Sequence, residues 1–109
     1  MKNKIGQILT MTEDFIIESC FDKKVIQVKT GDTGFIDSKG SIHYIDGQAR
    51  GKMQKLKDVE IKGYDYESIA TLIFKKIYNE YGLAEVFEDY GIEKKGFIDS
   101  IEDILTDIL

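Results

Sequence analysis

The chain has 109 residues, of which 42% are hydrophobic and 32% are charged, and its formal net charge is −5. This length predicts one domain with enough apolar material for a core, and the composition excludes an intrinsically disordered chain. No apolar run is longer than three residues, so we expect neither a membrane-spanning helix nor a secretory signal, and we place the protein in the cytoplasm.

Charge and hydrophobic periodicity change together near Gly63. Residues 1–63 carry eleven Lys or Arg against nine Asp or Glu, whereas residues 64–109 carry four Lys against eleven acids. The first part contains short β-branched segments separated by glycine, and the second repeats its apolar residues at helical spacing. Two electrically different surfaces favour a macromolecular partner over a small substrate.

The first 22 residues leave helix and strand open. The apolar residues within 5–9 fit a helical stripe, and residues 12–14 fit the cap of a short helix that runs through Cys20. Residues 15–17 fit either a helix or a strand.

The segment from Lys24 to Leu56 predicts short strands joined by glycine turns. We expect strands at residues 25–28, 35–36 and 41–45, and residues 53–61 supply one or two more. Asp46-Gly47 is a strong hairpin dipeptide. This spacing indicates a small antiparallel barrel or a strongly bent sheet.

After Gly63 the pattern predicts three helices. Asp65 is a good N-cap for the first helix, Tyr64 is placed to pack on Ile69, and Gly82 is placed to end that helix. A second helix is expected from Leu83 to Tyr90. Residues 94–96 are expected to break the chain, and a third helix then begins at Phe97. The predicted fold class is therefore α+β, with a small, bent antiparallel sheet followed by about three helices packed against it.

A basic loop is the first candidate binding site. Residues 47–57 carry four positive charges and no acid, at Arg50, Lys52, Lys55 and Lys57. With the preceding strand at 41–45, this segment resembles the KOW-type element of SH3-like barrels, in which a strand is followed by Gly, three residues, Gly-Lys and a second strand. The resemblance implies RNA or protein binding through the loop, with the four basic side chains on phosphates. The alternative is a solvated hairpin whose lysines keep a sheet edge soluble.

An acidic face in the helical part is the second candidate site. Its members are Glu85, Glu88, Asp89, Asp99, Glu102, Asp103 and Asp107, with Glu80 and Glu93 nearby. Asp99, Asp103 and Asp107 follow one another at i, i+4 and i+8, so they form one column on a helix. Such a column can imitate nucleic-acid phosphates and occupy a basic groove, and the alternative is an ordinary solvated surface. This half has no His and no EF-hand spacing, so we expect no metal site.

Catalytic patterns are absent from the sequence. Asp37 and Asp46 flank the strand that carries His43, and Cys20 is the single thiol, but position alone assigns His43 no orienting partner. We therefore expect packing or surface roles for them, no enzyme activity and no cofactor. The tyrosines of the acidic half divide between core and contact surface; they are Tyr64, Tyr66, Tyr78, Tyr81 and Tyr90.

The overall type resembles small phage and mobile-element proteins, including anti-CRISPR and anti-restriction inhibitors. The features that carry this resemblance are small size, an acidic helical end and a basic set in which Arg50 is the single arginine. It implies non-catalytic binding to a nuclease or its ribonucleoprotein, as a DNA mimic. A small RNA-binding module that uses the basic loop, and a homo-oligomer that buries the tyrosines, are the alternatives.

Overall fold

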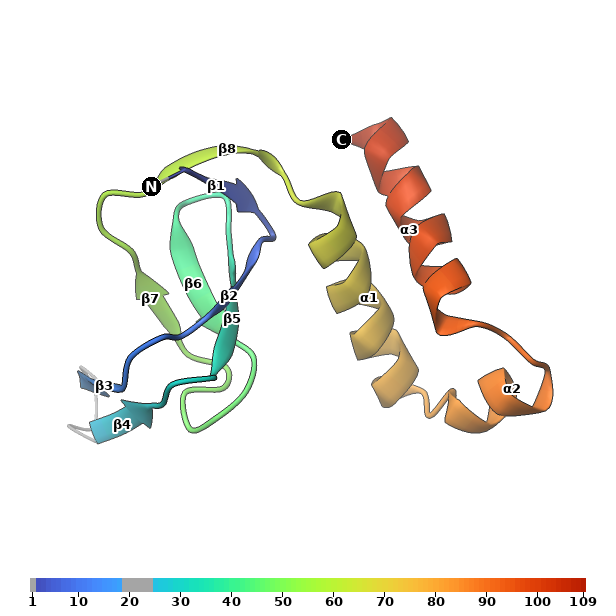
Figure 1. Ribbon diagram of the computed structural model, residues 1–109, viewed down its shortest axis with the longest axis horizontal. Helices are drawn as coiled ribbons and strands as arrows, with labels where there is room; N and C mark the ends of the chain where they lie inside the picture. The colour runs from blue at the N-terminus through green and yellow to red at the C-terminus, as the bar shows by residue number, and fades with distance from the viewer. Residues whose placement is uncertain (1, 19–24) are drawn as a thin grey trace. The chain divides into compact units, whose positions relative to one another are not determined.

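The computed structural model describes residues 2–18 and 25–109 of the chain (Figure 1). It divides into two compact units, Met1–Gly63 and Tyr64–Leu109, which we call the strand unit and the helical unit. The division falls at the point where the charge and periodicity of the sequence change. Strands fill the first unit and helices the second, which confirms the predicted α+β class. The expected packing of helices on a sheet, and a single domain, stay predictions.

Eight strands lie in the described part of the chain and form three sheets. They are β1 (Lys2–Ile5), β2 (Ile8–Thr10), β3 (Phe15–Glu18), β4 (Val25–Val28), β5 (Thr33–Ile36), β6 (Ser41–Tyr44), β7 (Met53–Lys55) and β8 (Glu60–Tyr64). The largest sheet has the order β2-β5-β6-β7, while β1 pairs with β8 and β3 with β4. The strands expected between residues 25 and 61 are thus confirmed, and the SH3-like resemblance stays a prediction.

The N-terminal segment is extended, so the helical alternative for it is wrong within the described residues. Phe15 to Glu18 form β3 and pair with β4, with Phe15 opposite Val28 and Ile17 opposite Ile26. Asp14 does not cap a helix, because its Oδ1 accepts hydrogen bonds from the backbone and the hydroxyl of Thr30. The cross-strand partners in β4, about ten residues further along the chain, decide the conformation here.

The core of the strand unit lies on the inward face of the four-stranded sheet. Val28, Ile42 and Ala49 are fully buried, and Tyr44 is 2% exposed. The Tyr44 hydroxyl donates to Gln54 Oε1 at 2.8 Å, and burial raises the pKa of Tyr44. A buried phenol therefore keeps a hydrogen-bond partner within the unit.

Close packing requires glycine at one position of this core. At Gly34, in β5, a Cβ would lie 2.7 Å from Ile42 Cγ1 and 2.8 Å from the carbonyl oxygen of His43. Neither the buried Ile42 side chain nor the paired backbone of His43 can move away without disturbing the hydrogen bonds between β5 and β6. A side chain at this position would therefore push the two strands apart.

The first helix begins and ends as the sequence predicts. α1 (Tyr66–Glu80) has Asp65 as its N-cap, and Asp65 Oδ1 accepts from the backbone N–H of Ser68 at 3.1 Å. Gly82 follows the C-cap with φ +57, the left-handed conformation in which glycine commonly ends helices. Tyr64 stacks on Tyr66 with ring centroids 6.0 Å apart.

The prediction that residues 94–96 break the chain is wrong. α2 (Ala84–Asp89) is short, and α3 (Lys94–Ile108) already includes these residues. Glu93 is extended, and its carbonyl accepts from the N–H of Phe97 as the first turn closes. Glycine is tolerated at Gly96 because a helix interior penalises it by only about 1 kcal/mol relative to alanine, which packing can offset.

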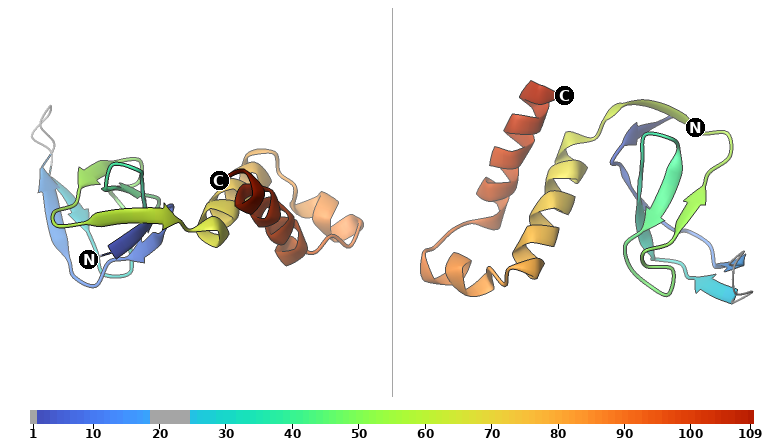
Figure 2. Two further views of the ribbon diagram at one scale, coloured as in Figure 1. Left: turned by 90° about the horizontal axis from the view of Figure 1, so that it is seen from above. Right: turned by 180° about the vertical axis from the view of Figure 1, so that it is seen from behind.

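An aromatic cluster holds the helical unit together. Phe74 of α1 lies 5.6 Å from both Phe87 of α2 and Phe97 of α3, measured between ring centroids, and Tyr78 meets Phe87 edge-on at 5.3 Å. The Nζ of Lys94 lies 4.8 Å from the centre of the Tyr78 ring. These contacts join the end of α1 to the start of α3, and the two helices run antiparallel, side by side (Figure 2).

Candidate functional site

The acidic column of α3 lies on the helix side away from the hydrophobic contacts. Asp99, Asp103 and Asp107 are exposed, whereas Ile98, Ile101 and Leu105 are half-buried. At about 100° per residue the two sets point in nearly opposite directions. Glu102, one residue before the column's middle member, is half-buried beside the apolar side. The predicted column is therefore a real surface feature, and Glu102 stands at its edge.

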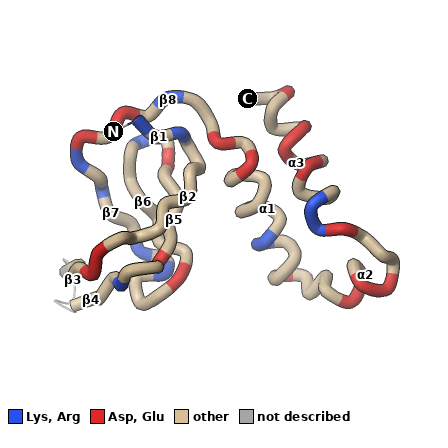
Figure 3. Tube along the Cα trace, viewed as in Figure 1, with Lys and Arg blue, Asp and Glu red and all other residues tan. Residues whose placement is uncertain are grey.

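The carboxylates of α2 form the other part of the acidic face. Glu85, Glu88 and Asp89 are exposed, and Phe87 between them is buried in the aromatic cluster. Figure 3 shows acidic positions on both α2 and α3, with a short basic segment at the start of α3. Lys94 and Lys95 supply that segment. The acidic face thus consists of two groups on consecutive helices.

The carboxylates of the acidic face have no intramolecular partner among the described residues. Within residues 2–18 and 25–109, the single ion pair shorter than 4.0 Å joins His43 and Asp37, which belong to the strand unit. None of the side-chain hydrogen bonds in these ranges involves a carboxylate of α2 or α3. Like charges at i, i+4 spacing destabilise a helix by about 0.2–0.5 kcal/mol per pair. The column therefore costs stability that the described part of the molecule does not recover.

Two aspartates of the strand unit are used differently, because they link segments that lie 13 and 16 residues apart in the chain. Asp46 accepts from the N–H and hydroxyl of Thr33 at 2.7 and 2.6 Å. Asp14 likewise accepts hydrogen bonds from the backbone N–H and the hydroxyl of Thr30. These hydrogen bonds, chiefly from the Thr33 hydroxyl to Asp46 and from the Thr30 backbone to Asp14, lower the pKa of both carboxyls. Asp14 and Asp46 are therefore structural carboxylates, whereas the carboxylates of the acidic face on α2 and α3 are unengaged among the described residues.

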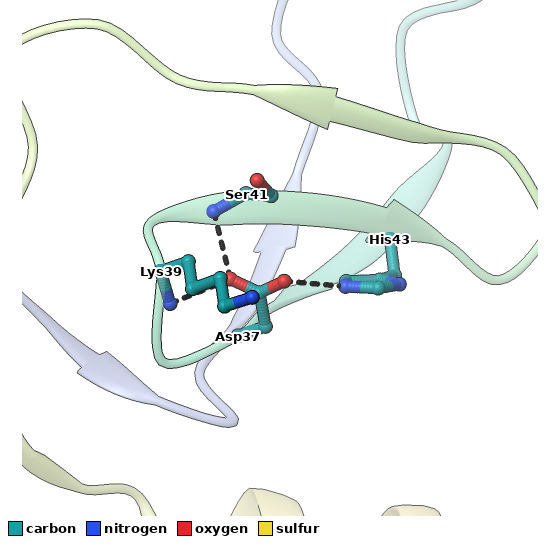
Figure 4. A network of polar contacts seen from close by, with 4 residues as sticks. All are labelled: Asp37, Lys39, Ser41 and His43. Atoms are coloured by element: carbon teal, nitrogen blue, oxygen red, sulfur yellow. Dashed lines mark hydrogen bonds and ion pairs between the residues drawn. The ribbon is translucent and has the colours of Figure 1, made fainter.

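The most heavily engaged carboxylate is Asp37, in the turn between β5 and β6 (Figure 4). Its Oδ1 accepts from the backbone N–H groups of Lys39 and Ser41, both at 2.9 Å, and its Oδ2 lies 2.8 Å from Nε2 of His43. The hydrogen bond from His43, together with those from the backbone, lowers the Asp37 pKa to about 2. His43 thus has the orienting partner that its sequence position did not reveal.

The His43–Asp37 pair has the features of a structural clamp. The imidazole stacks on Phe35 at 4.8 Å with an interplanar angle of 1°, so one ring face is covered. Phe35, His43 and Met53 are direct cross-strand neighbours on the outward face of the sheet. Among the described residues, no hydroxyl or thiol is hydrogen-bonded to His43. Cys20, the other half of the Cys/His pair considered from the sequence, lies outside the described residues.

The basic loop is an ordered hairpin between β6 and β7. The backbone N–H of Tyr44 donates a hydrogen bond to the carbonyl of Lys52, and the carbonyl of Tyr44 accepts one from the N–H of Gly51. Ala49, in the middle of the loop, is fully buried in the core. Gly47 has φ +72 and packs so closely on Asp32 that a Cβ would lie 2.5 Å from its Oδ2. The predicted hairpin is therefore confirmed.

The four basic side chains of this loop are exposed; they are Arg50, Lys52, Lys55 and Lys57. Lys55 belongs to β7, which is an edge strand of its sheet. Lysines on an exposed edge strand hinder pairing with other chains. A structural explanation is therefore available for Lys55, while Arg50 and Lys52 occupy the turn itself.

The tyrosines of the helical unit differ in exposure, and none of the five is fully buried; their role as a contact surface stays a prediction. Tyr81 and Tyr90 are 72% and 79% exposed, whereas Tyr66 and Tyr78 are half-buried. Tyr64 lies between these groups at 36%.

Comparison of the chain with protein-family models, with curated proteins and with solved structures finds no match. In the part of the chain that the structure describes, no helix is both long and apolar enough to span a membrane. The same residues contain no group of three or more His, Cys, Asp or Glu side chains that could hold a metal ion.

Proposed function

We propose that this chain is a non-catalytic inhibitor that binds a basic protein through its acidic face. The partner class is a nuclease, or its ribonucleoprotein, with a groove that normally holds nucleic acid. The proposal places the protein among anti-CRISPR or anti-restriction inhibitors of phage or mobile-element type, acting in the host cytoplasm.

The observation that carries the proposal is the contrast between the two kinds of carboxylate. Aspartates of the strand unit accept two or three hydrogen bonds each at Asp14, Asp37 and Asp46. Those of the helical column are exposed and unengaged among the described residues. Repulsion within the column is relieved when a basic partner supplies the opposite charge.

The spacing of the column supports mimicry of a phosphate backbone. Residues four apart on an α-helix are separated by about 6 Å along its axis. One strand of DNA carries a charge about every 3.4 Å. The column of Asp99, Asp103 and Asp107 thus provides about half of that linear charge density, and the carboxylates of α2 add to it.

The test is inhibition of a purified RNA-guided nuclease and of a restriction nuclease by the full chain. We expect one of these to lose cleavage of its DNA substrate at stoichiometric inhibitor, and excess non-cleavable duplex DNA to compete with the inhibitor for the enzyme. Inhibition that is insensitive to competing DNA would contradict the mimicry mechanism.

The alternative function is RNA binding through the basic loop. It is favoured by the exposure of Arg50, Lys52, Lys55 and Lys57 on an ordered hairpin. Replacing Arg50, Lys52 and Lys55 by glutamine should then abolish binding to a single-stranded RNA at physiological salt. Where residual binding can be measured at low salt, the slope of log K against log salt concentration should fall by about one for each phosphate that the variant no longer neutralises. RNA binding that survives these changes would exclude the basic loop as the RNA-binding site.

A further inference from the structure

The two-stranded ribbon of β3 and β4 has one strand edge that is open. In the part of the chain that the structure describes, β3 pairs with β4 alone, and no strand lies along its other edge. Both views of Figure 2 place the ribbon at the margin of the strand unit. An unpaired edge presents backbone N–H and C=O groups in the arrangement that a further strand requires.

The hydrogen bonds of β4 identify which backbone groups of β3 face outward. The N–H of Gln27 donates to Gln48 Oε1 at 3.0 Å, so it points away from β3. Gln27 and Ile16 are direct partners in the antiparallel register. The two residues of such a pair either bond to each other across the ladder or both point out of it. The N–H and C=O of Ile16 therefore point outward, and by alternation those of Glu18 do too.

The outer edge of β4 is closed by side chains, whereas that of β3 is not. Gln48 occupies the N–H of Gln27, and just beyond β4 the N–H of Lys29 donates to Asp32 Oδ2 at 2.9 Å. Within residues 2–18 and 25–109, no hydrogen bond is made to the outward backbone groups of Ile16. Lysine or proline commonly protects an edge strand, and β3 contains neither. β3 is therefore the less protected edge of the ribbon.

The exposed side chains of the ribbon favour an apolar residue on a strand beside β3. Phe15 and Ile17 are half-buried and pack against the core of the strand unit. Ile16 points to the opposite face and is 63% exposed, and Val25, diagonal to it on β4, is 59% exposed. A β-branched residue on a third strand would cover Ile16, because neighbouring strands place side chains of one face about 5 Å apart.

The charge around β3 selects a basic peptide over a second copy of the chain. Residues 13–18 contain Glu13, Asp14 and Glu18 and no Lys or Arg. Two copies of β3 paired edge to edge would bring these acids together, and like charges opposite one another in a sheet are destabilising. Lysine or arginine at alternate positions of a peptide would instead meet them with the opposite charge.

We propose that the open edge of β3 binds an extended peptide of a partner protein, in which β-branched apolar residues alternate with Lys or Arg. The peptide adds a third strand to the ribbon, and the outward N–H and C=O groups of Ile16 and Glu18 pair with it. Backbone hydrogen bonds give the affinity, while the contact with Ile16 and the acids of residues 13–18 give the preference for this composition. The proposal goes beyond the inhibitor function of the acidic face and does not depend on it.

NMR titration of the isotope-labelled full chain with a capped peptide of three Lys-Val repeats tests the proposal. We expect the amide resonances of Ile16 and Glu18 to move furthest, with a Kd of about 0.1–1 mM, because a single short strand pair is weak. The same peptide with all backbone nitrogens methylated keeps every side chain but loses the N–H groups that pair. It should bind at least about tenfold more weakly, and so should a capped peptide of three Glu-Val repeats.

Ile16→Pro removes the outward N–H at this edge without removing a hydrogen bond to β4. Proline is tolerated on edge strands where the missing N–H would face out of the sheet. I16P should weaken binding of the Lys-Val peptide at least about tenfold. The matched control I16V keeps the N–H and a β-branched side chain, so it should bind like the unmodified chain. Circular dichroism verifies that both variants are folded.

Absence of binding up to about 5 mM Lys-Val peptide, or equal binding of the methylated peptide, would overturn the proposal. Resonance shifts confined to the helical unit, or equal binding by I16P and I16V, would do the same. Shifts of the Ile16 resonance that depend on the concentration of the chain alone would assign the edge to a second copy and exclude the peptide partner. The methylated peptide is compared on the unmodified chain, so this comparison does not depend on the folding of I16P.

Discussion

The side chains of Asp37 and His43 meet at 2.8 Å, Oδ2 to Nε2, across the turn that joins β5 to β6. The same carboxylate also accepts from the backbone of Lys39 and Ser41. One side chain therefore fixes both the turn and the orientation of the imidazole that stacks on Phe35.

The engagement of Asp37 predicts a specific acid sensitivity. Its hydrogen bonds lower the Asp37 pKa to about 2 in the folded chain. A depressed folded-state pKa contributes stability that is fully present above the ordinary value of about 3.9 and is lost as the pH falls through about 2. Asp37→Asn should reduce the free energy of unfolding by about 1–2 kcal/mol near neutral pH. It should also flatten the change in stability between about pH 4 and pH 2.

Urea unfolding of both proteins from pH 2 to pH 7 measures this effect. Asp14 and Asp46 also have lowered pKa values, so the difference between the two stability curves isolates Asp37. Parallel curves across the acid range would show that protonation of Asp37 does not contribute to the pH dependence of the free energy of unfolding.

Gly34 and Gly96 should respond oppositely to alanine. A Cβ at Gly34 would lie 2.7 Å from Ile42 Cγ1, whereas nothing lies within 4 Å of one at Gly96. Gly34→Ala should therefore destabilise the chain by about 1–3 kcal/mol through overpacking. Gly96→Ala should stabilise it by up to about 1 kcal/mol, because α3 gains a better helix former. Thermal unfolding compares the two, and equal effects would contradict the packing described around Gly34.

Removal of the Phe74 ring should unfold the helical unit. Phe74 packs against Tyr78, Phe87 and Phe97, and it is 5% exposed. Phe74→Ala should cost about 3–5 kcal/mol, which is comparable with the stability of a small domain. Far-UV circular dichroism should lose helix signal, while amide resonances of the strand unit persist in NMR spectra.

Val86→Ala is the matched control for Phe74→Ala. Val86 is 43% exposed on α2, so its truncation should change stability by about 0.5 kcal/mol or less. Retention of helix in Phe74→Ala would show that the aromatic cluster does not hold the unit together.

Neutralising the acidic column should stabilise the isolated protein. D99N/D103N/D107N removes two like-charge pairs at i, i+4 and one carboxylate from the last turn of α3, where the helix dipole disfavours it. The gain should be about 0.5–1 kcal/mol at low salt and should shrink near 1 M salt, as urea unfolding can measure. A decrease in stability would instead reveal an intramolecular role for these carboxylates.

Local signals in the sequence predicted much of the fold. The cap at Asp65, the stop at Gly82 and the hairpin at Asp46-Gly47 depend on residues close in the chain, and each is confirmed. Residues 15–17 were ambiguous because their conformation depends on pairing with β4, about ten residues further on. The start of α3 was misplaced because Gly96 alone does not end a helix whose other residues favour it.

The candidate site was predictable in part. The spacing of Asp99, Asp103 and Asp107 identified an exposed column, and the structure places all three on the solvent side of α3. The half-burial of Glu102 follows from its angular position and could have been read from the same spacing. The hydrogen bond between Asp37 and His43 was missed because it depends on how the β5–β6 turn folds back.

The central claim is that the acidic face binds a basic nuclease groove, and paired charge variants test it most directly. The affinity of the full chain for the inhibited nuclease is measured at about 50 and 500 mM salt, together with D99K/E102K/D103K and R50Q/K52Q/K55Q. We expect the first variant to bind at least about tenfold more weakly, with a shallower salt dependence, and the second to bind like the unmodified chain. Unchanged binding of D99K/E102K/D103K, with no binding by R50Q/K52Q/K55Q, would contradict the claim and assign the partner to the basic loop.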